Sequence, residues 1–266
     1  MCRLFGMTAG MGEPVEATFW LLDAPDSLSA QSHRNPDGAG VGCFDAAGSP
    51  HIDKQPLAAF EDRAFIAAAR RLRSRTFVAH VRHATTGALT HENTHPFMMD
   101  GRLFAHNGVI EDLELLEREL GDDMRRVHGQ TDSERYFALI TREIARRGGD
   151  VDAGIRSAVG WVLANLGLRS INFVLITDGE LWALRYPQTH SLFVLERASG
   201  GGGVGDGALE QTSSHGTRVR SEDAARRATV VVASERMDGE RAWRELAVGE
   251  LVHVDGSLAV TSARIV

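Results

Sequence analysis

The sequence predicts an α+β fold with mainly antiparallel sheets. Short apolar and β-branched segments are numerous, and three of them carry Asp-Gly or Asn-Gly pairs, which favour tight turns. The helical segments come in consecutive groups and do not alternate regularly with strands. A doubly wound parallel sheet would require that alternation, so the pattern disfavours it.

Strands and turns dominate the first half of the chain, and one long helix is expected at residues 57–75. That segment has apolar residues at helical spacing and arginines in its last turn, where the helix dipole favours positive charge. Residues 76–84 and 102–110 are expected to be strands because they are apolar and bounded by polar turns. The remaining elements expected here are a strand and turn at 2–10, a short helix at 16–25 that stops near Pro25, and a Gly-rich turn leading into a strand at 34–44.

Three helices are expected next, at 111–120, 131–149 and 151–167. Thr131 and Glu134 form a capping-box pattern at the start of the second helix, and a glycine pair ends it. The third helix is expected to be weakened by internal glycines. The remaining expected elements are a hairpin at 172–186 with its tip at Asp178-Gly179, strands at 191–197 and 228–235, and a closing hairpin at 249–261 with Asp255-Gly256.

The composition is that of a globular protein with a substantial core, at 43% hydrophobic and 24% charged residues. A net charge of −7 gives no electrostatic case for binding nucleic acid or an anionic membrane. The N-terminus lacks a secretory-signal pattern, and no apolar run is long enough to span a membrane. Two cysteines are too few for a disulfide framework, so we expect a reducing, cytoplasmic location.

Polar residues gather in three short segments where strands end or helices begin, at 81–87, 105–110 and 129–134. Loops at the ends of rigid elements are where functional residues concentrate. Each segment alone is more often a turn, a helix cap or a solvated charge. A cysteine directly behind the initiator methionine adds a fourth feature, because a free thiol near an exposed terminus oxidises easily and needs a reason.

These motifs, in this order, resemble those of the class II glutamine amidotransferases, which are N-terminal-nucleophile hydrolases. The similarity rests on MCRLFG, RNPDGAGVG, VRHATTG, ENTHPF, AHNG and GQTDSE, and it covers most of residues 2–186. The segment at 230–251 resembles the end of stand-alone members. The resemblance implies a four-layer α/β/β/α sandwich and a single glutamine amidotransferase type-2 domain over 2–266. The segment around 199–228 is Gly-rich and almost free of apolar residues, and it is expected to be an exposed loop in that domain.

The resemblance also implies a catalytic set formed by Cys2, Asn107 and Gly108. Removal of Met1 would leave Cys2 with a free α-amino group, whose pKa of about 7.7–8.0 suits a general base. The thiolate would attack the substrate amide and form a γ-glutamyl thioester, which water hydrolyses. The Asn107 side chain and the Gly108 backbone N–H match the family's oxyanion donors. Arg3 follows the nucleophile and is expected to help fix the terminus.

A second set matches the family's binding site for the amino-acid head of the substrate. Arg82 corresponds to the residue that binds the α-carboxylate, for which a guanidinium offers two parallel hydrogen bonds. Asp132 corresponds to the residue that receives the α-ammonium. Three further residues are expected to line the same pocket: Thr85, Thr86 and Gly87.

No metal or other cofactor is expected. His80, His83, His91, His95, His106 and His128 crowd into one region of the sequence. His80 and His83, however, are expected on opposite faces of a strand, and the HENTH segment lacks the helical frame of a metalloprotease. Hydrogen bonding near the pocket is the expected role of these histidines, and Cys43 is expected to be a small buried hydrophobe.

The natural leaving group stays open at this point. The substrate is either glutamine or a γ-glutamyl conjugate, and the product is glutamate with ammonia or an amine. A free-standing γ-glutamyl hydrolase, similar to those of ergothioneine or glutathione-type metabolism, is one alternative. A glutaminase subunit that delivers ammonia to a separate synthase subunit is another, and a silent glutamine-binding domain or a metal-dependent hydrolase are less favoured.

Overall fold

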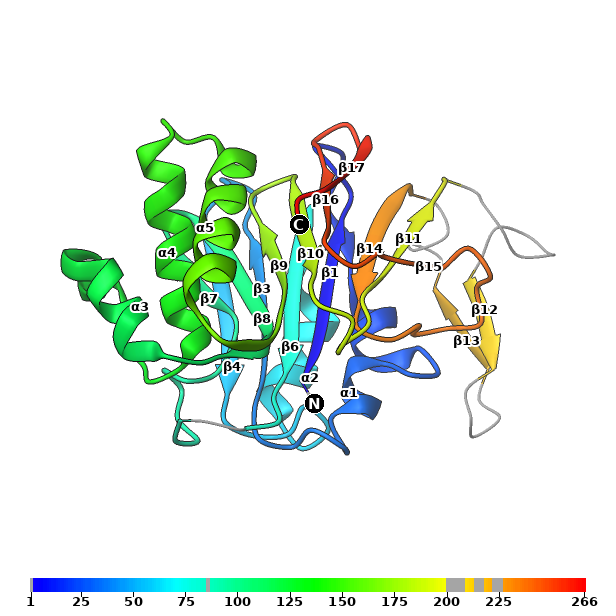
Figure 1. Cartoon of the computed structure of the whole chain (residues 1–266). Helices are drawn as coiled ribbons and strands as arrows, with labels where there is room; N and C mark the ends of the chain where they lie inside the picture. The colour runs from blue at the N-terminus through cyan, green and yellow to red at the C-terminus, as the bar shows by residue number, and fades with distance from the viewer. Residues whose placement is uncertain (1, 85–86, 200–208, 213–217, 222–226) are drawn as a thin grey trace.

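Two antiparallel β-sheets packed face to face form the centre of the protein (Figure 1). The computed structural model describes residues 2–84, 87–199, 209–212, 218–221 and 227–266. The seven-stranded sheet contains, in spatial order, β15 (Arg244–Glu245), β11 (Phe193–Arg197), β14 (Thr229–Ala233), β1 (Arg3–Thr8), β6 (Thr76–Val81), β3 (Ala39–Phe44) and β4 (Pro50–Gln55). The six-stranded sheet contains β17 (Val260–Arg264), β16 (Glu250–Val254), β10 (Leu181–Arg185), β9 (Leu168–Ile176), β8 (Arg102–Ile110) and β7 (Phe97–Met99). All pairings between these strands are antiparallel.

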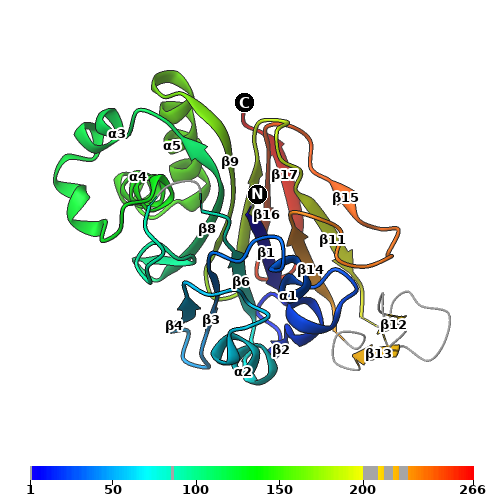
Figure 2. The ribbon, with the colours of Figure 1, turned by 90° about the horizontal axis from the view of Figure 1, so that it is seen from below.

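Helices cover the outer face of each sheet (Figure 2). The π-helix η1 (Phe19–Asp23), α1 (Leu28–Gln31) and α2 (Arg63–Arg71) share a hydrophobic core with the seven-stranded sheet. The six-stranded sheet is covered by α3 (Leu113–Leu120), α4 (Asp132–Arg146) and α5 (Val151–Asn165), with the 3₁₀-helix η2 (Gly121–Arg126) beside them. The predicted four-layer α/β/β/α sandwich is therefore confirmed. Among the described residues, no helix is long and apolar enough to cross a bilayer.

The side chains of strand β1 contribute to two hydrophobic cores, one on each face of its sheet. Successive side chains of a strand point to opposite faces. Phe5 and Met7 therefore pack outward against the helices, whereas Leu4 packs between the sheets. All three side chains are at most 2% exposed, and each contributes about 1.5–3 kcal/mol through burial. The small hydrophobe expected at Cys43 is also confirmed, at 2% exposed in β3.

Two helices of the first half are shorter than the sequence pattern predicts. The helix expected at 57–75 is only α2, because Asp62 accepts a hydrogen bond from Ala64 N at 2.8 Å and starts the helix there. Beyond α2 the chain becomes extended, and β5 (Arg73–Ser74) pairs with β2 (Val15–Glu16). The short helix expected at 16–25 is the five-residue η1, which ends before Pro25.

Helix α4 begins where the capping pattern predicts. The Thr131 hydroxyl accepts a hydrogen bond from Glu134 N at 3.2 Å. The Glu134 carboxylate does not return to the backbone of Thr131 but accepts from the N–H groups of His128 and Gly129, at 3.1 and 2.6 Å. It thus fixes the turn that leads into the helix, and Asp132 follows at the first helical position.

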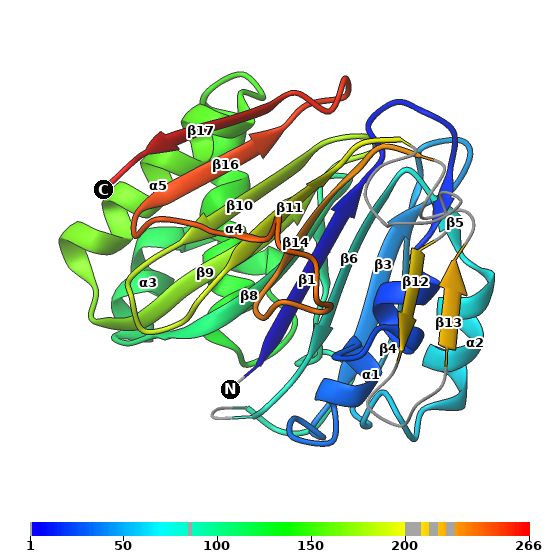
Figure 3. The same ribbon diagram turned by 90° about the vertical axis from the view of Figure 1, so that its right-hand side faces the viewer.

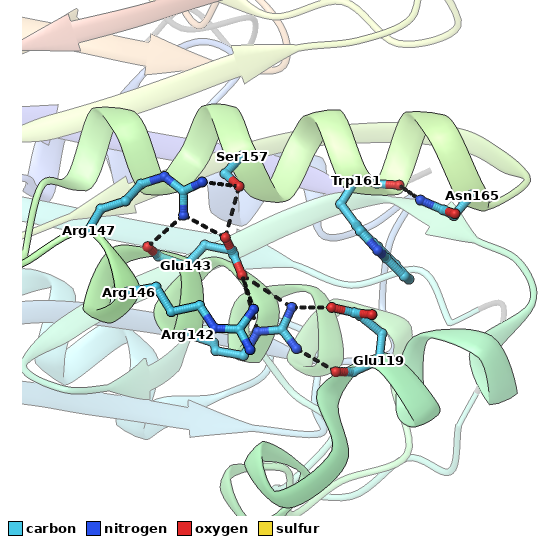
Figure 4. A network of polar contacts seen from close by, with 8 residues as sticks. All are labelled: Glu119, Arg142, Glu143, Arg146, Arg147, Ser157, Trp161 and Asn165. Carbon is cyan, nitrogen blue, oxygen red and sulfur yellow. Dashed lines mark hydrogen bonds and ion pairs between the residues drawn. The ribbon is translucent and has the colours of Figure 1, made fainter.

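Helices α4 and α5 pack closely because α5 carries a glycine at their crossing. A Cβ on Gly154 would lie 2.4 Å from Ile144 Cγ1, so the glycine that was expected to weaken α5 permits close packing. Beyond the crossing, Glu143 joins the two helices through a polar network (Figure 4). Its carboxylate accepts from Ser157 Oγ on α5 at 2.8 Å and from Arg147 Nη1 at 2.6 Å.

The predicted hairpins are present. Thr177 N donates to Glu180 O at 3.0 Å between β9 and β10, and Gly179 has φ +96°, which a glycine adopts without strain. Strands β16 and β17 form the closing hairpin. Within the segment expected to be a loop, β12 (Leu209–Thr212) pairs with β13 (Arg218–Ser221). The stretches 200–208, 213–217 and 222–226 of that segment lie outside the described residues.

Candidate active site

Cys2 lies immediately before β1, the strand at the centre of its sheet (Figure 3). On one side of β1, Arg3 is paired with Val81 at the end of β6. Continuing this register places Cys2 beside Arg82. The half-buried Cys2 Sγ accepts a hydrogen bond from His83 N at 3.2 Å and lies 3.4 Å from His83 O. The thiol is thus fixed against the turn that follows β6.

Opposing effects act on the acidity of this thiol. Burial raises the pKa of Cys2, and the negative charge of Asp132 raises it further. The His83 N–H and the positive charge of Arg82 lower it, but burial outweighs them. A thiol in this environment is mostly protonated near neutral pH, so its use as a nucleophile requires a nearby base.

Arg82 is 3% exposed and directs its guanidinium at the loop that follows it. Its Nη1 donates to Ala88 O at 3.2 Å, and its Nη2 donates to Gly87 O at 3.3 Å. Gly87 has φ +74°, a conformation that disfavours other residues. Asn93 also binds this loop, because its Nδ2 donates to Ala88 O at 3.1 Å. Thr85 and Thr86, predicted for this pocket, lie outside the described residues.

Asn107 and Gly108 lie on β8, in the facing sheet. They pair with Asn172 and Ile171 of β9. A Cβ on Gly108 would lie 1.8 Å from Ser170 O, so only glycine fits while the strands keep this separation. Asn107 is 4% exposed and lines a pocket that it shares with Arg3, the neighbour of Cys2.

Asp132 reaches the same region from the first turn of α4. Its Oδ2 accepts a hydrogen bond from Ile110 N at 2.8 Å, which ties the helix start to the end of β8. The charge of Asp132 acts on both Cys2 and Arg82. Three residues predicted for the site, Cys2, Arg82 and Asp132, therefore act on one another although they lie at the ends of three different elements, β1, β6 and α4.

Three histidines are buried beside these residues. The rings of His80 and His95 lie with their centroids 4.2 Å apart and their planes tilted by 36°. The two ring nitrogens of His95 have no hydrogen-bond partner among the described residues. The hydrogen-bonding role expected of these histidines is therefore wrong for His95, whereas the pKa of His80 is raised by a hydrogen bond with the backbone of His106. It is confirmed for His106, whose Nδ1 is 2.8 Å from Ser133 Oγ. Burial lowers the pKa of all three, to about 3 for His80.

No cluster of three or more metal-ligating side chains occurs within the described part of the chain. The described strand β6 ends at Val81, so His83 lies beyond it and is exposed, whereas His80 lies within it and is buried. The two histidines thus differ in burial, and they do not share the strand on which both were expected.

The sequence prediction missed the wall of the site on the β14 side. Leu4 N donates to Ser234 Oγ at 2.9 Å, and Arg3 forms an ion pair with Glu235. The buried Asn172 holds the loop before β11, because its Nδ2 donates to His190 O at 3.0 Å. These contacts join residues 18 to 232 positions apart, and no local pattern marks them.

Lys54, the only lysine of the chain, is another missed residue. It lies on β4, and its Nζ donates to Thr94 O at 2.7 Å and to Pro96 O at 3.3 Å. Burial lowers its pKa to about 8. Lys54 therefore stabilises the loop that contains Asn93, the residue that donates to Ala88 O.

Two facing antiparallel sheets between helical layers form the fold of the N-terminal-nucleophile hydrolases, and here a cysteine lies just ahead of the central strand. The family model described as "Glutamine amidotransferases class-II" matches residues 1–265. The chain therefore belongs to the class II glutamine amidotransferases, and it is a glutamine-hydrolysing domain of that family. The resemblance found in the motifs is thereby confirmed.

Relatives of different lengths share the domain. The putative glutamine amidotransferase YafJ of Escherichia coli is 25% identical over 258 residues, covering 94% of this chain and 96% of that protein. The probable glutamine amidotransferase DUG3 of Saccharomyces cerevisiae is 28% identical over 163 residues, 58% of this chain and 46% of that protein. A glutamine–fructose-6-phosphate aminotransferase of Bradyrhizobium diazoefficiens is 30% identical over 161 residues, 59% of this chain but only 25% of that enzyme.

Solved structures share the fold. The glutamine phosphoribosylpyrophosphate amidotransferase of Bacillus subtilis superposes with a TM-score of 0.67 at 21% identity, over 100% of this chain and 49% of that one. A predicted glutamine amidotransferase from Pseudomonas aeruginosa has a TM-score of 0.65 at 20% identity, over 98% of this chain and 100% of that one. At these identities the likeness concerns the fold alone.

Proposed function

We propose that this protein hydrolyses a γ-glutamyl amide bond with Cys2 as the nucleophile. The observation that carries the proposal is the position of Cys2 Sγ, 3.2 Å from His83 N and within the electrostatic reach of both Arg82 and Asp132. A nucleophile flanked by one cation and one anion suits a substrate whose head is an amino acid. The pocket beside Arg3 and Asn107 gives the reacting amide a place to extend.

The first step requires loss of Met1, so that Cys2 gains a free α-amino group. This amine takes the thiol proton, and the sulfur attacks the γ-carbonyl carbon. The Asn107 side-chain amide and the Gly108 N–H would then donate to the developing oxyanion, and losing one such donor typically costs about 100- to 1000-fold in rate. The C–N bond breaks as the amine returns its proton to the leaving nitrogen, and water hydrolyses the thioester to glutamate.

Arg82 and Asp132 would bind the two charges of the glutamyl head. An ionised carboxylate accepts at about four positions, so the bond from Ile110 N leaves Asp132 able to accept from an α-ammonium. The bonds from Arg82 to Gly87 O and Ala88 O orient its guanidinium for a carboxylate. Thr85, Thr86 and Gly87 would complete this end of the pocket. Holding both charges positions the γ-carbonyl at the sulfur.

Transfer of ammonia to a separate synthase subunit is the second candidate. It is favoured by the match to a domain that forms a quarter of the fructose-6-phosphate aminotransferase mentioned above. In that case the chemistry at Cys2 is the same, and only the fate of the ammonia differs. A soluble partner that raises the rate of glutamine hydrolysis on mixing would distinguish this candidate.

The test is glutamate release from glutamine and from γ-glutamyl amides by the purified protein. We expect release that survives a chelator and is lost in Cys2→Ala. Cys43→Ala is the matched control, because it removes the other cysteine, which lies in β3 away from the site. Release that persists in Cys2→Ala, or that a chelator abolishes, would overturn the proposal.

A further inference from the structure

The nucleophile has two different neighbours across its sheet (Figure 3). On the β6 side lies Arg82, proposed to bind the glutamyl head. On the β14 side, the residues after Ala233 continue the antiparallel pairing with the start of β1. Ser234 N donates to Leu4 O at 3.0 Å, and Glu235 forms its ion pair with Arg3. The segment 234–236 therefore runs alongside residues 2–4, opposite the head-binding side.

A pocket of about 360 Å³ opens on this second side. The residues that line it include Arg3, Asn107, His190, Phe193, Glu235 and Arg236. A substrate whose head occupies the Arg82 side, with its carbonyl at Cys2 and Asn107, must direct its leaving group toward this pocket. Ammonia is the size of a single water molecule, whereas a pocket of this size holds on the order of ten. The space suits a larger amine.

The walls of the pocket are fixed in place. Asn172 Nδ2 donates to the carbonyl oxygens of His190 and Ser191, at 3.0 and 3.5 Å. Arg185 Nε also donates to His190 O, at 3.2 Å. Because Asn172 pairs with Asn107 in the β8–β9 ladder, one strand pair supports both the pocket wall and the proposed oxyanion donor. Binding would therefore require little ordering.

The charges around the pocket favour an anion. Glu235 forms ion pairs with both Arg3 and Arg34, so two positive charges already balance its negative charge. Arg236 is exposed, lies over the Phe193 ring at 5.3 Å from its centroid, and has no carboxylate partner among the described residues. Burial lowers the pKa of His190, whose ring also interacts with the backbone of Asn107 through a hydrogen bond. The Arg236 guanidinium thus brings to the pocket a positive charge that no described carboxylate neutralises.

We propose that this pocket is the leaving-group subsite and that it selects an amine bearing a carboxylate, namely an amino acid or short peptide. Arg236 binds the carboxylate, and the departing amine lies against the wall that includes His190 and Phe193. The inference rests on the proposed hydrolysis at Cys2. In the step it concerns, the γ-carbonyl carbon exchanges its bond to nitrogen for one to sulfur. The nitrogen leaves with the proton taken from the thiol, as the free α-amino group of the product.

The test compares γ-glutamylglycine with γ-glutamylglycinamide, in which a neutral amide replaces the carboxylate of the leaving group, and with glutamine. We expect kcat/KM to be about tenfold or more higher for the carboxylate substrate, the usual effect of a hydrogen-bonded charge. Arg236→Ala should bring the two values together and leave the value for glutamine unchanged. Arg241→Ala is the matched control, because Arg241 is also exposed and lies in the same connection between β14 and β15, but outside the pocket.

Equal kcat/KM values for the two substrates in the wild type, or a preference that survives in Arg236→Ala, would overturn the subsite while leaving glutamine hydrolysis intact. Failure of the proposed function would look different. No Cys2-dependent glutamate would then form from any of the three substrates, and the subsite proposal would fall with it. Because Arg236 is exposed, melting temperatures of the variants should match the wild type and exclude unfolding as a cause.

Discussion

Substitution of Gly108 by alanine tests how the two strands beneath the site determine its geometry. The added Cβ would lie 1.8 Å from Ser170 O and 2.6 Å from His106 Nε2, whereas ordinary contact begins at 3.4 Å. To relieve the clash, β8 and β9 would have to separate by about 1.6 Å, and a misplacement of about 1 Å can cost 100-fold in rate. We expect Gly108→Ala to lose about 100-fold or more in kcat/KM for glutamine. Overpacking should also cost about 1–3 kcal/mol of stability.

The control is the same substitution on a surface with room for it. Gly160 lies exposed on α5, with no atom within 4 Å of the added Cβ. Gly160→Ala should stabilise the protein by about 0.5–1 kcal/mol, because alanine favours helix over glycine, and should not change kcat/KM. Activity is measured as glutamate release and stability by thermal and urea unfolding. A Gly108→Ala variant as active and stable as Gly160→Ala would refute the reasoning.

Three further outcomes follow from the contacts described above. Asp132→Asn should keep the hydrogen bond from Ile110 N but lose the charge that faces the α-ammonium. KM for glutamine should therefore rise about 10- to 100-fold in steady-state kinetics, and an unchanged KM would contradict the proposed head clamp. Burial raises the pKa of Glu143, but hydrogen bonds from its partners outweigh this and hold it below 4.5. Glu143→Gln should cost about 1–3 kcal/mol in unfolding measurements above pH 4.5, and the deficit should disappear as the pH falls through the folded pKa; a deficit independent of pH would count against it. Burial lowers the pKa of His80 and His95 below 6.5, so the unfolded state binds more protons below that pH and stability falls with acidification. His95→Phe should keep an aromatic ring beside His80 and flatten the dependence of melting temperature on pH below about 6.5, and an unaltered slope would argue against this origin.

Local chemistry made much of the fold predictable. Thr131 marks the start of α4 because a hydroxyl at that position accepts a backbone N–H, and Asp178-Gly179 marks a hairpin because glycine adopts positive φ. The helix at 57–75 was predicted too long, since its periodicity does not reveal that Asp62 caps a shorter one. Periodicity also did not predict β7, whose three residues are too few to show alternation.

The candidate site was predictable where function concentrates polar residues in short motifs. Cys2, Arg82, Asn107 and Asp132 each lie in such a motif. The pocket wall on the β14 side was not predictable. Glu235 reaches the site only because β14 pairs with β1, and neither segment carries a local pattern that indicates this pairing. Hydrogen bonds from buried side chains to carbonyl groups far away in the sequence could not be predicted either, because no local pattern indicates them.

The most direct measurement is mass spectrometry of peptides from enzyme quenched with acid during turnover of a γ-glutamyl amide. The account predicts an N-terminal peptide that begins at Cys2, without Met1, and that carries one γ-glutamyl group on sulfur. The peptide containing Cys43 should be unmodified and serves as the internal control. An active protein that retains Met1, or that carries the acyl group on any other residue, would contradict the account.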